Sequence, residues 1–412
     1  MRIDEAKQRI EHIIQELRNR NYAEGTIKSY KLIYISFLKF LLMNETSEIT
    51  EDLLLEYISQ RSGYDVKGFY GKGNNKINHV MKPIHVFWDY YSTNEITFKL
   101  RSKIPPFKCP VQFYEEYESY KDSLYEAGLS KATQLNLIPT AEKLLMYLEK
   151  ESLNSLKKLR ITEVLDFLKT YKDKAPKYVS TKIYAIRKFL SFLYFEKFIK
   201  DDIHSKLPRV RIMRNAFIPY TWRVEDVKKL LNTIDRADPK GKRDYAIILL
   251  VVRLGLRVSD VRGLCFKQLD WNKKTISLIM QKTQRHLTLP LLDDVGWAII
   301  DYIKNGRPDS KSDRVFIRHR APYDSVGENE SFYRELHRYM VAANIDAPLD
   351  AHCGLHSLRS TLASVMLEQA TPLNIISNTL GHKNTNTTSI YLKIDLKGLR
   401  KCALDPEEVF NQ

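Results

Sequence analysis

The sequence has few of the features that mark a secreted, fibrous or disordered protein. Its 412 residues include four cysteines, which lie far apart without a Cys-x-x-Cys pair, so the pattern predicts neither a disulfide framework nor a zinc knuckle. Only 15 glycines and 15 prolines are spread along the chain, which argues against a fibrous repeat and against disorder. We therefore expect a folded protein whose thiols are reduced.

Long apolar runs are also absent. The longest, Tyr245 to Val252, ends at Arg253 and is much shorter than the ~20 residues needed to cross a bilayer. Residues 1–7 contain no apolar core that could serve as a secretion signal. These absences predict no membrane association and a cytoplasmic protein, located at the nucleoid if the host is a prokaryote.

Positive charge, by contrast, is present in excess. The 66 Lys and Arg residues outnumber the 50 Asp and Glu residues, which gives a net charge of +16. This excess favours a polyanionic partner, because Lys and Arg bind phosphates and release the counterions around them. Charge alone leaves open a protein whose lysines are merely solvated.

The first half of the chain is predicted to be helical. In residues 1–100 apolar side chains recur with the 3.6-residue period of a buried helix face, and Thr50 is expected to cap one helix. Residues 111–205 repeat this pattern, since the segment Ile161–Leu165 resembles Ile49–Leu53. We therefore predict two similar helical modules in tandem, with chance similarity between two amphipathic bundles as the alternative.

Two basic, proline-containing segments, residues 99–110 and 206–219, separate these modules from each other and from the rest. Such a segment can lie along a phosphate backbone, although a solvated connector has the same composition. A chain of this length is expected to form two or three domains. We place them at residues 1–104, 111–207 and 216–412.

The last domain is predicted to combine helices with strands. The run Tyr245–Val252 belongs to a helix that is expected to span Arg243 to Leu254 and to end at Gly255. Ser259 is a candidate cap for a short helix. Two β runs, Thr275–Met280 and His286–Leu291, alternate as in a half-buried hairpin. Further helices are expected near residues 223–234, 294–304, 331–343, 356–368 and 372–380, and from Thr385 or Asn386 to Leu392. Pro372 is expected to be the first residue of the helix 372–380, and Gly381 is expected to end it. The fold class is therefore mostly α with a small β-sheet or hairpin in the C-terminal domain.

Polar residues that could take part in catalysis occur together in this last domain. Tyr391 follows His382 by nine residues, and His356 and Arg359 share a short helix upstream. A tyrosine with an arginine and histidines close by is a candidate nucleophile toward a phosphate in a cationic pocket. Taken alone, Tyr391 could equally be one packed aromatic among 24 tyrosines.

The order and setting of these residues resemble the tyrosine recombinase (phage-integrase) family. The turn Gly255–Asp260 resembles the family's first-arginine turn, and Lys282 in the predicted hairpin resembles its catalytic lysine. The segment His356–Arg359 matches the His-x-x-Arg motif. The sequence Leu380–His382 followed by Tyr391 matches the family's Leu-Gly-His to Tyr spacing.

This resemblance implies a site-specific DNA recombinase of the integrase or transposase type, serving a mobile element. It would cut and rejoin double-stranded DNA through a covalent 3′-phosphotyrosine intermediate and a Holliday junction, as a homo-tetramer on two DNA sites with accessory DNA-bending proteins. Residues 111–207 would be the core-binding domain that clamps DNA opposite the catalytic domain, 216–412. Residues 1–104 would contact accessory DNA or another protomer, and the tail 393–412 would dock in cis or in trans.

By the same resemblance each site residue has a role. Arg257 and Arg359 would hold the non-bridging oxygens of the pentacoordinate phosphate, and Lys282 would protonate the leaving 5′-oxygen. Tyr391 would be the nucleophile. No cofactor and no metal is implied, because the arginines supply the positive charge.

The two histidines complete the site: His356 would move the tyrosine proton and His382 would donate a hydrogen bond to the phosphate. His352 and Cys353 beside His356 suggest a metal site only superficially, since no fourth ligand is suitably spaced. The family often has His where this chain has Ser360, and we expect no loss of chemistry from that departure.

Some alternatives remain open at this point. Hairpin lysines are usually solvated, and Lys273, Lys274 and Arg285 lie near Lys282 in the sequence. Arg253 is expected to face solvent or to pair locally. A type IB topoisomerase or telomere resolvase would share the chemistry, and a DNA-binding regulator without catalysis would share the fold.

Overall fold

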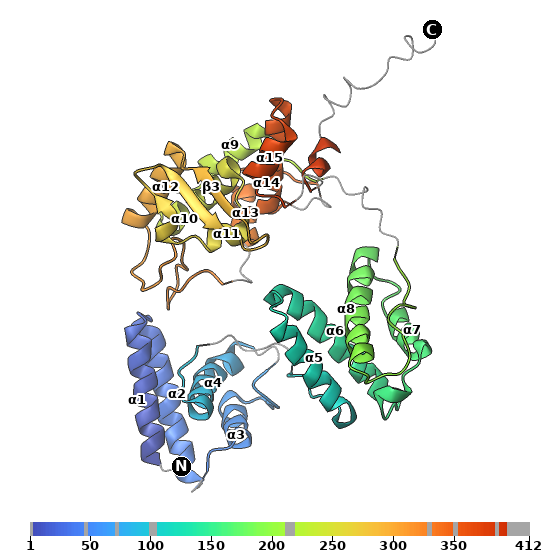
Figure 1. Ribbon diagram of the computed structural model, residues 1–412. Coiled ribbons are helices and arrows are strands. Elements are labelled where there is room, and N and C mark those ends of the chain that lie inside the picture. The colour runs from blue at the N-terminus through green and yellow to red at the C-terminus, as the bar shows by residue number, and fades with distance from the viewer. Residues whose placement is uncertain are drawn as a thin grey trace. The chain divides into compact units, whose positions relative to one another are not determined.

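The computed structural model of the chain describes residues 3–44, 48–70, 74–98, 105–210, 219–327, 332–348, 353–383 and 387–393. In these ranges the protein is mostly helical with one three-stranded antiparallel sheet in the C-terminal region, which confirms the predicted fold class (Figure 1). Two compact units are distinguished: residues 1–65, 75–99 and 217–412 form one, and residues 66–74 and 100–216 form the other. The three-domain division stays a prediction. The tail after residue 393, His352 and most of both basic segments lie outside the described residues.

The N-terminal part of the chain packs four helices together: α1 (Ile3–Asn19), α2 (Glu24–Met43), α3 (Glu51–Ser62) and α4 (Asn75–Thr93). Thr50 caps α3 as predicted, because its hydroxyl accepts a hydrogen bond from the backbone N–H of Leu53 at 3.3 Å. The ring of Phe37 packs against those of Tyr57 and Phe87, with centroids 5.2 and 5.3 Å apart. Aromatic packing therefore joins α2, α3 and α4.

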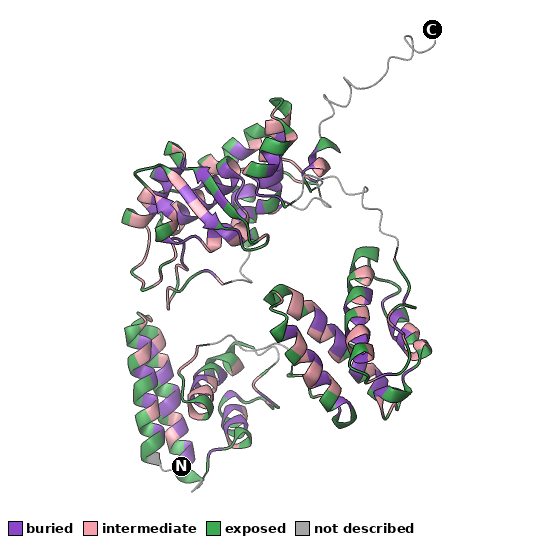
Figure 2. Ribbon diagram, viewed as in Figure 1, coloured by how far each residue is buried: buried purple, intermediate pink, exposed green. Residues whose placement is uncertain are grey.

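Residues 105–210 hold a second set of helices: α5 (Tyr114–Glu126), α6 (Lys131–Lys150), α7 (Ile161–Lys169) and α8 (Pro176–Phe195), with 3₁₀ turns η1 (Val111–Phe113) and η2 (Leu156–Lys158). Buried residues line the inner faces of these helices (Figure 2). α2 and α6 each have 20 residues, and α4 and α8 have 19 and 20. Helix lengths in the two modules are therefore similar.

The C-terminal region has its core around α10 (Pro239–Leu254). The residues from Ala246 to Val251 are each at most 4% exposed, as predicted for a buried helix. α10 packs against two neighbours, α12 (Asp293–Asn305) and α14 (Leu355–Glu368). The remaining elements are α9 (Val224–Thr233), α11 (Val258–Arg262), α13 (Tyr333–Ala342), α15 (Leu373–Thr379), and the 3₁₀ turns η3 (Phe266–Gln268) and η5 (Ser389–Lys393).

The sheet contains β1 (Leu269–Asp270), β2 (Thr275–Ile279) and β3 (His286–Pro290), antiparallel and in that order. Ile276 pairs with Leu289, and Leu278 pairs with Leu287. All four side chains are buried, which confirms the predicted half-buried hairpin. β1 was not predicted, because two residues are too few to show an alternation.

Two predicted helix starts are wrong by one to four residues. α10 begins at Pro239, four residues earlier than the apolar pattern indicates, because Asp238 caps it by accepting a hydrogen bond from the N–H of Gly241 at 2.9 Å. Pro372 is the N-cap of α15 and not its first helical residue. Such one-residue differences are common at helix ends.

Two further predictions also need correction. Ser259 does not cap a short helix: it lies inside α11, and Arg257 is the N-cap. Within the described residues, the last predicted helix is a 3₁₀ turn, η5, because a short segment can close the tighter i to i+3 bonds instead.

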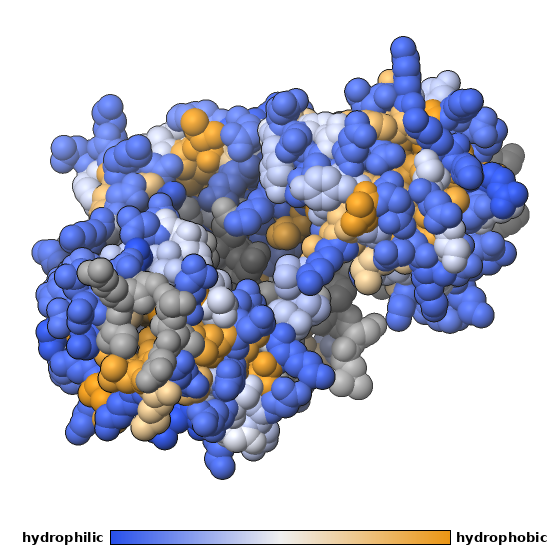
Figure 3. All heavy atoms as spheres, turned by 90° about the horizontal axis from the view of Figure 1, so that it is seen from below, coloured by the Kyte–Doolittle hydropathy of each residue, from blue (hydrophilic) through white to orange (hydrophobic). Residues whose placement is uncertain are grey.

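No helix in the described ranges is long and apolar enough to cross a membrane. Hydrophilic side chains dominate the face shown in Figure 3, and hydrophobic ones gather there in a few patches.

A buried ion pair fixes α10 within its module. Arg243 and Asp244 are 5% and 1% exposed, and their Nη2 and Oδ1 atoms lie 2.6 Å apart. The hydroxyl of Tyr339 on α13 donates to Asp244 Oδ2 at 2.9 Å, and Arg243 donates to the carbonyl of Ile317 at 3.1 Å. These bonds satisfy both charges and tie α10 to α13.

We predict that Arg243→Leu destabilises the C-terminal module by about 3–5 kcal/mol, because the Asp244 carboxylate would remain buried without its cation. Arg253→Leu is the matched control: Arg253 is on the same helix, and its pair with Asp294, 2.8 Å, is half exposed. That control should cost less than about 1 kcal/mol. Hydrogen exchange of α10 peptides against denaturant measures both, and equal losses would contradict the prediction.

Candidate active site

The centre of the site is Arg359 on α14, which is 1% exposed. Its guanidinium donates to the backbone carbonyl of Gly255, and its Nη2 donates to the carbonyl of Leu380 at 2.6 Å. These carbonyls lie at the ends of α10 and α15, so one side chain joins the ends of two helices. Burial, followed by repulsion from Arg257, lowers the pKa of Arg359 to about 10.

Two glycines give those helix ends their shape. Gly255 and Gly381 have φ values of +64° and +57°, the left-handed region in which glycine is favoured. A Cβ at Gly381 would overlap the sulfur of Met280, and one at Gly255 would lie 2.7 Å from a methyl of Leu380. Both predicted helix ends are confirmed.

His382 is held between Arg359 and the segment that leads to Tyr391. Its Nε2 lies 3.0 Å from Arg359 Nη2, and its Nδ1 lies 2.7 Å from the hydroxyl of Thr388. Burial, followed by repulsion from Arg359 and Arg257, lowers the pKa of His382 to about 4. The ring is therefore neutral at pH 7, and since Arg359 can only donate, Nε2 accepts and Nδ1–H donates to Thr388.

Tyr391, on η5, packs against the other side of this arrangement. It is 3% exposed and contacts a small cluster with Ala363, Ile376 and Leu380. Its ring lies 6.3 Å from that of His382, at an angle of 18°. A hydrogen bond between its hydroxyl and Arg359 favours the charged guanidinium. The nine-residue spacing thus brings tyrosine, histidine and arginine together.

Arg257 differs from Arg359 in having donors to spare. It is half-buried, and burial lowers its pKa. Within the described ranges its side chain forms one hydrogen bond, from Nη1 to the sulfur of Met280 at 3.7 Å. A thioether is a weak acceptor, so most of the five guanidinium N–H groups remain available for an anion.

Lys282 lies in the turn between β2 and β3 and is exposed. It is close enough to His356 and His382 to lower the pKa of both. The lysines that competed with it in the sequence are engaged elsewhere: Lys274 lies 2.8 Å from Asp293, and Lys273 lies 3.9 Å from Asp270. Of these hairpin lysines, the structure brings Lys282 to the site.

His356 completes the group from the same helix face as Arg359, three residues earlier. His356 is exposed, yet its pKa is lowered. The largest cause is partial desolvation by the surrounding protein, and the second is repulsion from Arg359, Lys282 and Arg257. All six predicted residues are therefore neighbours. Arg253 is about half exposed and forms an ion pair with Asp294, which agrees with the expectation that it faces solvent or pairs with a neighbour.

Sequence reasoning missed the residues that support the six. Arg285 donates to the carbonyl of His382 at 2.8 Å and so fastens the Lys282 turn to the His382 turn. Asp260 accepts a hydrogen bond from the N–H of Gln281 at 2.9 Å and joins α11 to the same turn. Burial raises the pKa of Asp260. Asp260 lay within the quoted arginine turn, but no spacing rule indicated Arg285.

A tyrosine hydroxyl with two guanidiniums, an ammonium and two imidazoles around it is suited to nucleophilic attack on a phosphodiester, whose added negative charge needs cations. The class of protein defined by this fold and site is a phosphoryl-transfer enzyme that acts on a nucleic-acid backbone.

Comparison with known proteins agrees with this class. The model of the phage integrase family matches residues 221–397, which include all six residues. A Sinorhizobium fredii protein named as an integrase/recombinase is 35% identical over 300 residues, 72% of this chain and 71% of that protein. Tyrosine recombinase XerD of Halalkalibacterium halodurans is 28% identical over 229 residues, 54% of this chain and 72% of XerD.

Two solved structures share the fold. A lambda integrase dimer bound to a core site aligns with a TM-score of 0.54 at 15% identity, covering 68% of this chain and 94% of that one. XerH recombinase bound to its DNA substrate aligns with a TM-score of 0.52 at 16% identity, covering 87% and 97%. The chain belongs to the phage integrase family of tyrosine recombinases. It is a site-specific, DNA-binding recombinase that breaks and rejoins DNA.

The lowered pKa of His382 predicts a pH dependence of stability. In the unfolded chain its imidazole takes up a proton near pH 6.5, and in the folded chain near pH 4. Between these values the unfolded chain binds more protons, so the free energy of unfolding should fall as pH falls from about 6.5 to 4. Urea unfolding across this range should show the decrease, and His382→Asn should make it shallower. An unchanged pH slope in that variant would contradict the neutral state of His382.

Proposed function

We propose that Tyr391 attacks the scissile phosphate and forms a covalent 3′-phosphotyrosine, which the 5′-hydroxyl of a second DNA strand then resolves. The observation that supports this most directly is the convergence of Tyr391, Arg359 and His382 in one buried contact. The covalent bond preserves the energy of the broken phosphodiester for rejoining. Two successive exchanges of this kind pass through a Holliday junction.

The two arginines are proposed to bind the phosphate in different ways. Arg257 has several free donors and suits bidentate contact with the non-bridging oxygens. Arg359 uses its terminal nitrogens within the protein, but its Nε–H has no acceptor within the described residues. A phosphate oxygen would satisfy that buried donor.

The proton transfers are assigned to Lys282 and His356. Lys282 is on a turn, and its ammonium is proposed to give a proton to the leaving 5′-oxygen. His356 has a lowered pKa, which suits it to accept the tyrosine proton as a neutral base. Both nitrogens of His382 are occupied in the DNA-free chain, so its proposed hydrogen bond to the phosphate requires release of Arg359 or Thr388.

The assembly on DNA is proposed to follow from the modules. Residues 111–207 would clamp DNA together with the C-terminal module, and four protomers would hold two DNA sites, with accessory DNA-bending proteins assisting. Support comes from the relatives: the lambda integrase structure is described as a dimer bound to a core site, and the XerH structure as bound to its substrate.

Replacement of the nucleophile tests the chemistry. Tyr391→Phe should abolish the covalent adduct with a nicked suicide DNA substrate, because the variant lacks the attacking hydroxyl, while DNA binding should persist. The adduct is measured by gel electrophoresis under denaturing conditions, with Tyr333→Phe, an exposed tyrosine, as the control. Adduct formation by Tyr391→Phe would overturn the assignment, and site-independent relaxation of supercoiled plasmid by the wild type would favour a topoisomerase.

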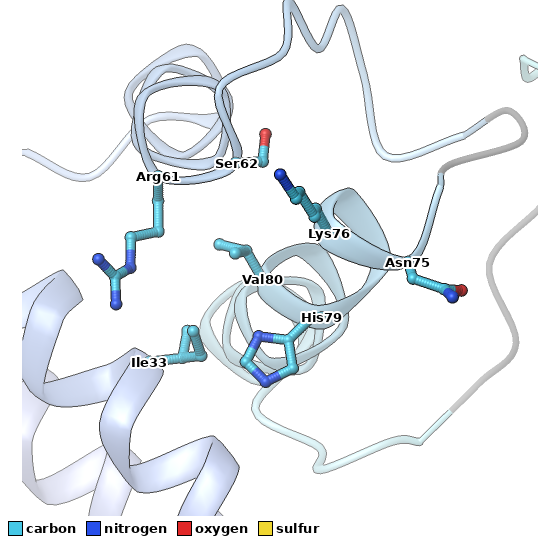
Figure 4. A pocket seen from close by; sticks show the side chains of 7 residues that line it. All are labelled: Ile33, Arg61, Ser62, Asn75, Lys76, His79 and Val80. Carbon is cyan, nitrogen blue, oxygen red and sulfur yellow. The ribbon is translucent and has the colours of Figure 1, made fainter.

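We further propose that the N-terminal helices contact the DNA backbone. A hollow of about 390 Å³ lies between α2, α3 and α4 and is lined by Ile33, Arg61, Ser62, Asn75, Lys76, His79 and Val80 (Figure 4). Neither Arg61 nor Lys76 forms an ion pair within the described residues, and no acidic side chain lines the hollow there. Lys76 is in the first turn of α4, where the helix dipole disfavours a cation unless an anion lies nearby.

Removal of these charges should weaken DNA binding in a salt-dependent way. The double variant Arg61→Ala/Lys76→Ala should lower the slope of log affinity against log salt by about 1, because at least one phosphate contact is lost. Lys31→Ala/Lys39→Ala removes the same charge from the exposed side of α2 and is the control. Fluorescence anisotropy at several salt concentrations measures the slope, and equal changes in both double variants would reject a specific contact.

A further inference from the structure

Among the residues that the structure describes from 219 onward, Trp222 is the first large buried side chain of the C-terminal module. It is 4% exposed, although Tyr220 and Arg223 beside it are not buried. Its indole Nε1–H donates to the hydroxyl of Ser357 at 2.7 Å, and its backbone N–H donates to the hydroxyl of Thr361 at 2.9 Å. Both N–H groups of one residue are therefore used on one stretch of α14.

The two hydroxyls are in turn fully engaged. Ser357 donates to the carbonyl of Gly354 at 2.6 Å, and Thr361 donates to the carbonyl of Ser357 at 2.9 Å. Each hydroxyl accepts a hydrogen bond from Trp222. Each also donates one to a backbone carbonyl, either within α14 or at Gly354, the residue that precedes α14. Complete buried networks of this kind specify one geometry, because any shift leaves a buried polar group unpaired.

The position of these hydroxyls on α14 relates them to the active site. Ser357 and Thr361 are four residues apart and share a helix face. His356 and Arg359 are three residues apart and share another face, and Arg359 is about 200° around the helix from Ser357. Trp222 thus holds α14 from the side opposite Arg359.

Rotation of α14 is the movement that this contact prevents. A rotation of about 20° would move a guanidinium about 6 Å from the helix axis by about 2 Å. A displacement of about 1 Å at a reacting group can cost about 100-fold in rate. Serine and threonine inside helices are otherwise neutral or unfavourable, so the two buried hydroxyls that bind Trp222, one within the His-x-x-Arg segment and one just after it, call for a function.

We propose that Trp222 is a positioning residue of the active site, which fixes the rotation of α14 through Ser357 and Thr361 and so places Arg359 and His356 at the phosphate. The inference rests on the proposed function, since it assumes that Arg359 binds the reacting group. It makes cleavage depend on a residue that lies far from the catalytic motifs in sequence.

The test compares chemistry with binding in the full-length protein. Trp222→Phe keeps an aromatic ring but removes the indole N–H. We expect its single-turnover rate of covalent adduct formation on a suicide DNA substrate to fall about 10-fold or more. Its affinity for the same DNA should change less than about 2-fold. Trp297→Phe, at a tryptophan that is 69% exposed, is the matched control and should keep the wild-type rate.

A double-mutant cycle tests whether loss of the hydrogen bond between Trp222 and Ser357 causes the slower adduct formation. Ser357→Ala should lower the rate by a similar factor, and Trp222→Phe in that background should lower it no further. Independent, multiplicative losses would overturn the proposal in favour of general packing. Thr361→Val is nearly isosteric and removes the second acceptor without changing the indole, so it should also slow adduct formation. This variant tests the proposal even if Trp222→Phe does not fold.

Failure of this proposal is separable from failure of the proposed function. If the wild type forms its adduct through Tyr391 and both Trp222→Phe and Thr361→Val react at the wild-type rate, Trp222 does not position the site. If Tyr391→Phe still forms the adduct, the proposed chemistry fails first, and the positioning of Arg359 fails with it.

Discussion

The burial of one arginine side chain sets the conditions for the rest of the C-terminal module. Removal of a guanidinium from water is costly unless acceptors compensate it, and Arg359 finds them in the carbonyls at the ends of α10 and α15. Those carbonyls are correctly placed because Gly255 and Gly381 turn the chain through the left-handed region. The two glycines and the arginine therefore depend on one another.

Other contacts hold the remaining site residues in place. Arg285 and Asp260 fasten the hairpin turn that carries Lys282, Thr388 fastens His382, and Trp222 fastens the back of α14. None of these residues needs to touch the phosphate. They hold side chains that come from α11, a turn, α14 and η5 in one place, which is the requirement for preorganised electrostatic stabilisation.

The sequence predicted the parts of this structure that are local. Helix periodicity, the Thr50 cap, the hairpin and the glycine ends depend on neighbouring residues. The six candidate site residues could be named because their spacing is short within each motif, and their roles stay a prediction. The cap at Arg257, the early start of α10 and strand β1 were missed, since one-residue signals compete with several equivalent choices. Contacts such as Trp222 with Ser357 join residues 135 positions apart, and no pattern along the chain encodes such a pairing.

The partners of Arg359 have a consequence for the charge of the empty site. They are two carbonyls, a neutral imidazole and the hydroxyl of Tyr391, and none is a carboxylate. The buried charge is therefore solvated by dipoles and is not cancelled, while the pKa of the nearby Asp260 carboxyl is raised by burial. Arg359 therefore places a positive potential inside a low-dielectric wall, and under the proposed chemistry the scissile phosphate would complete an electrostatic balance that the folded chain leaves open.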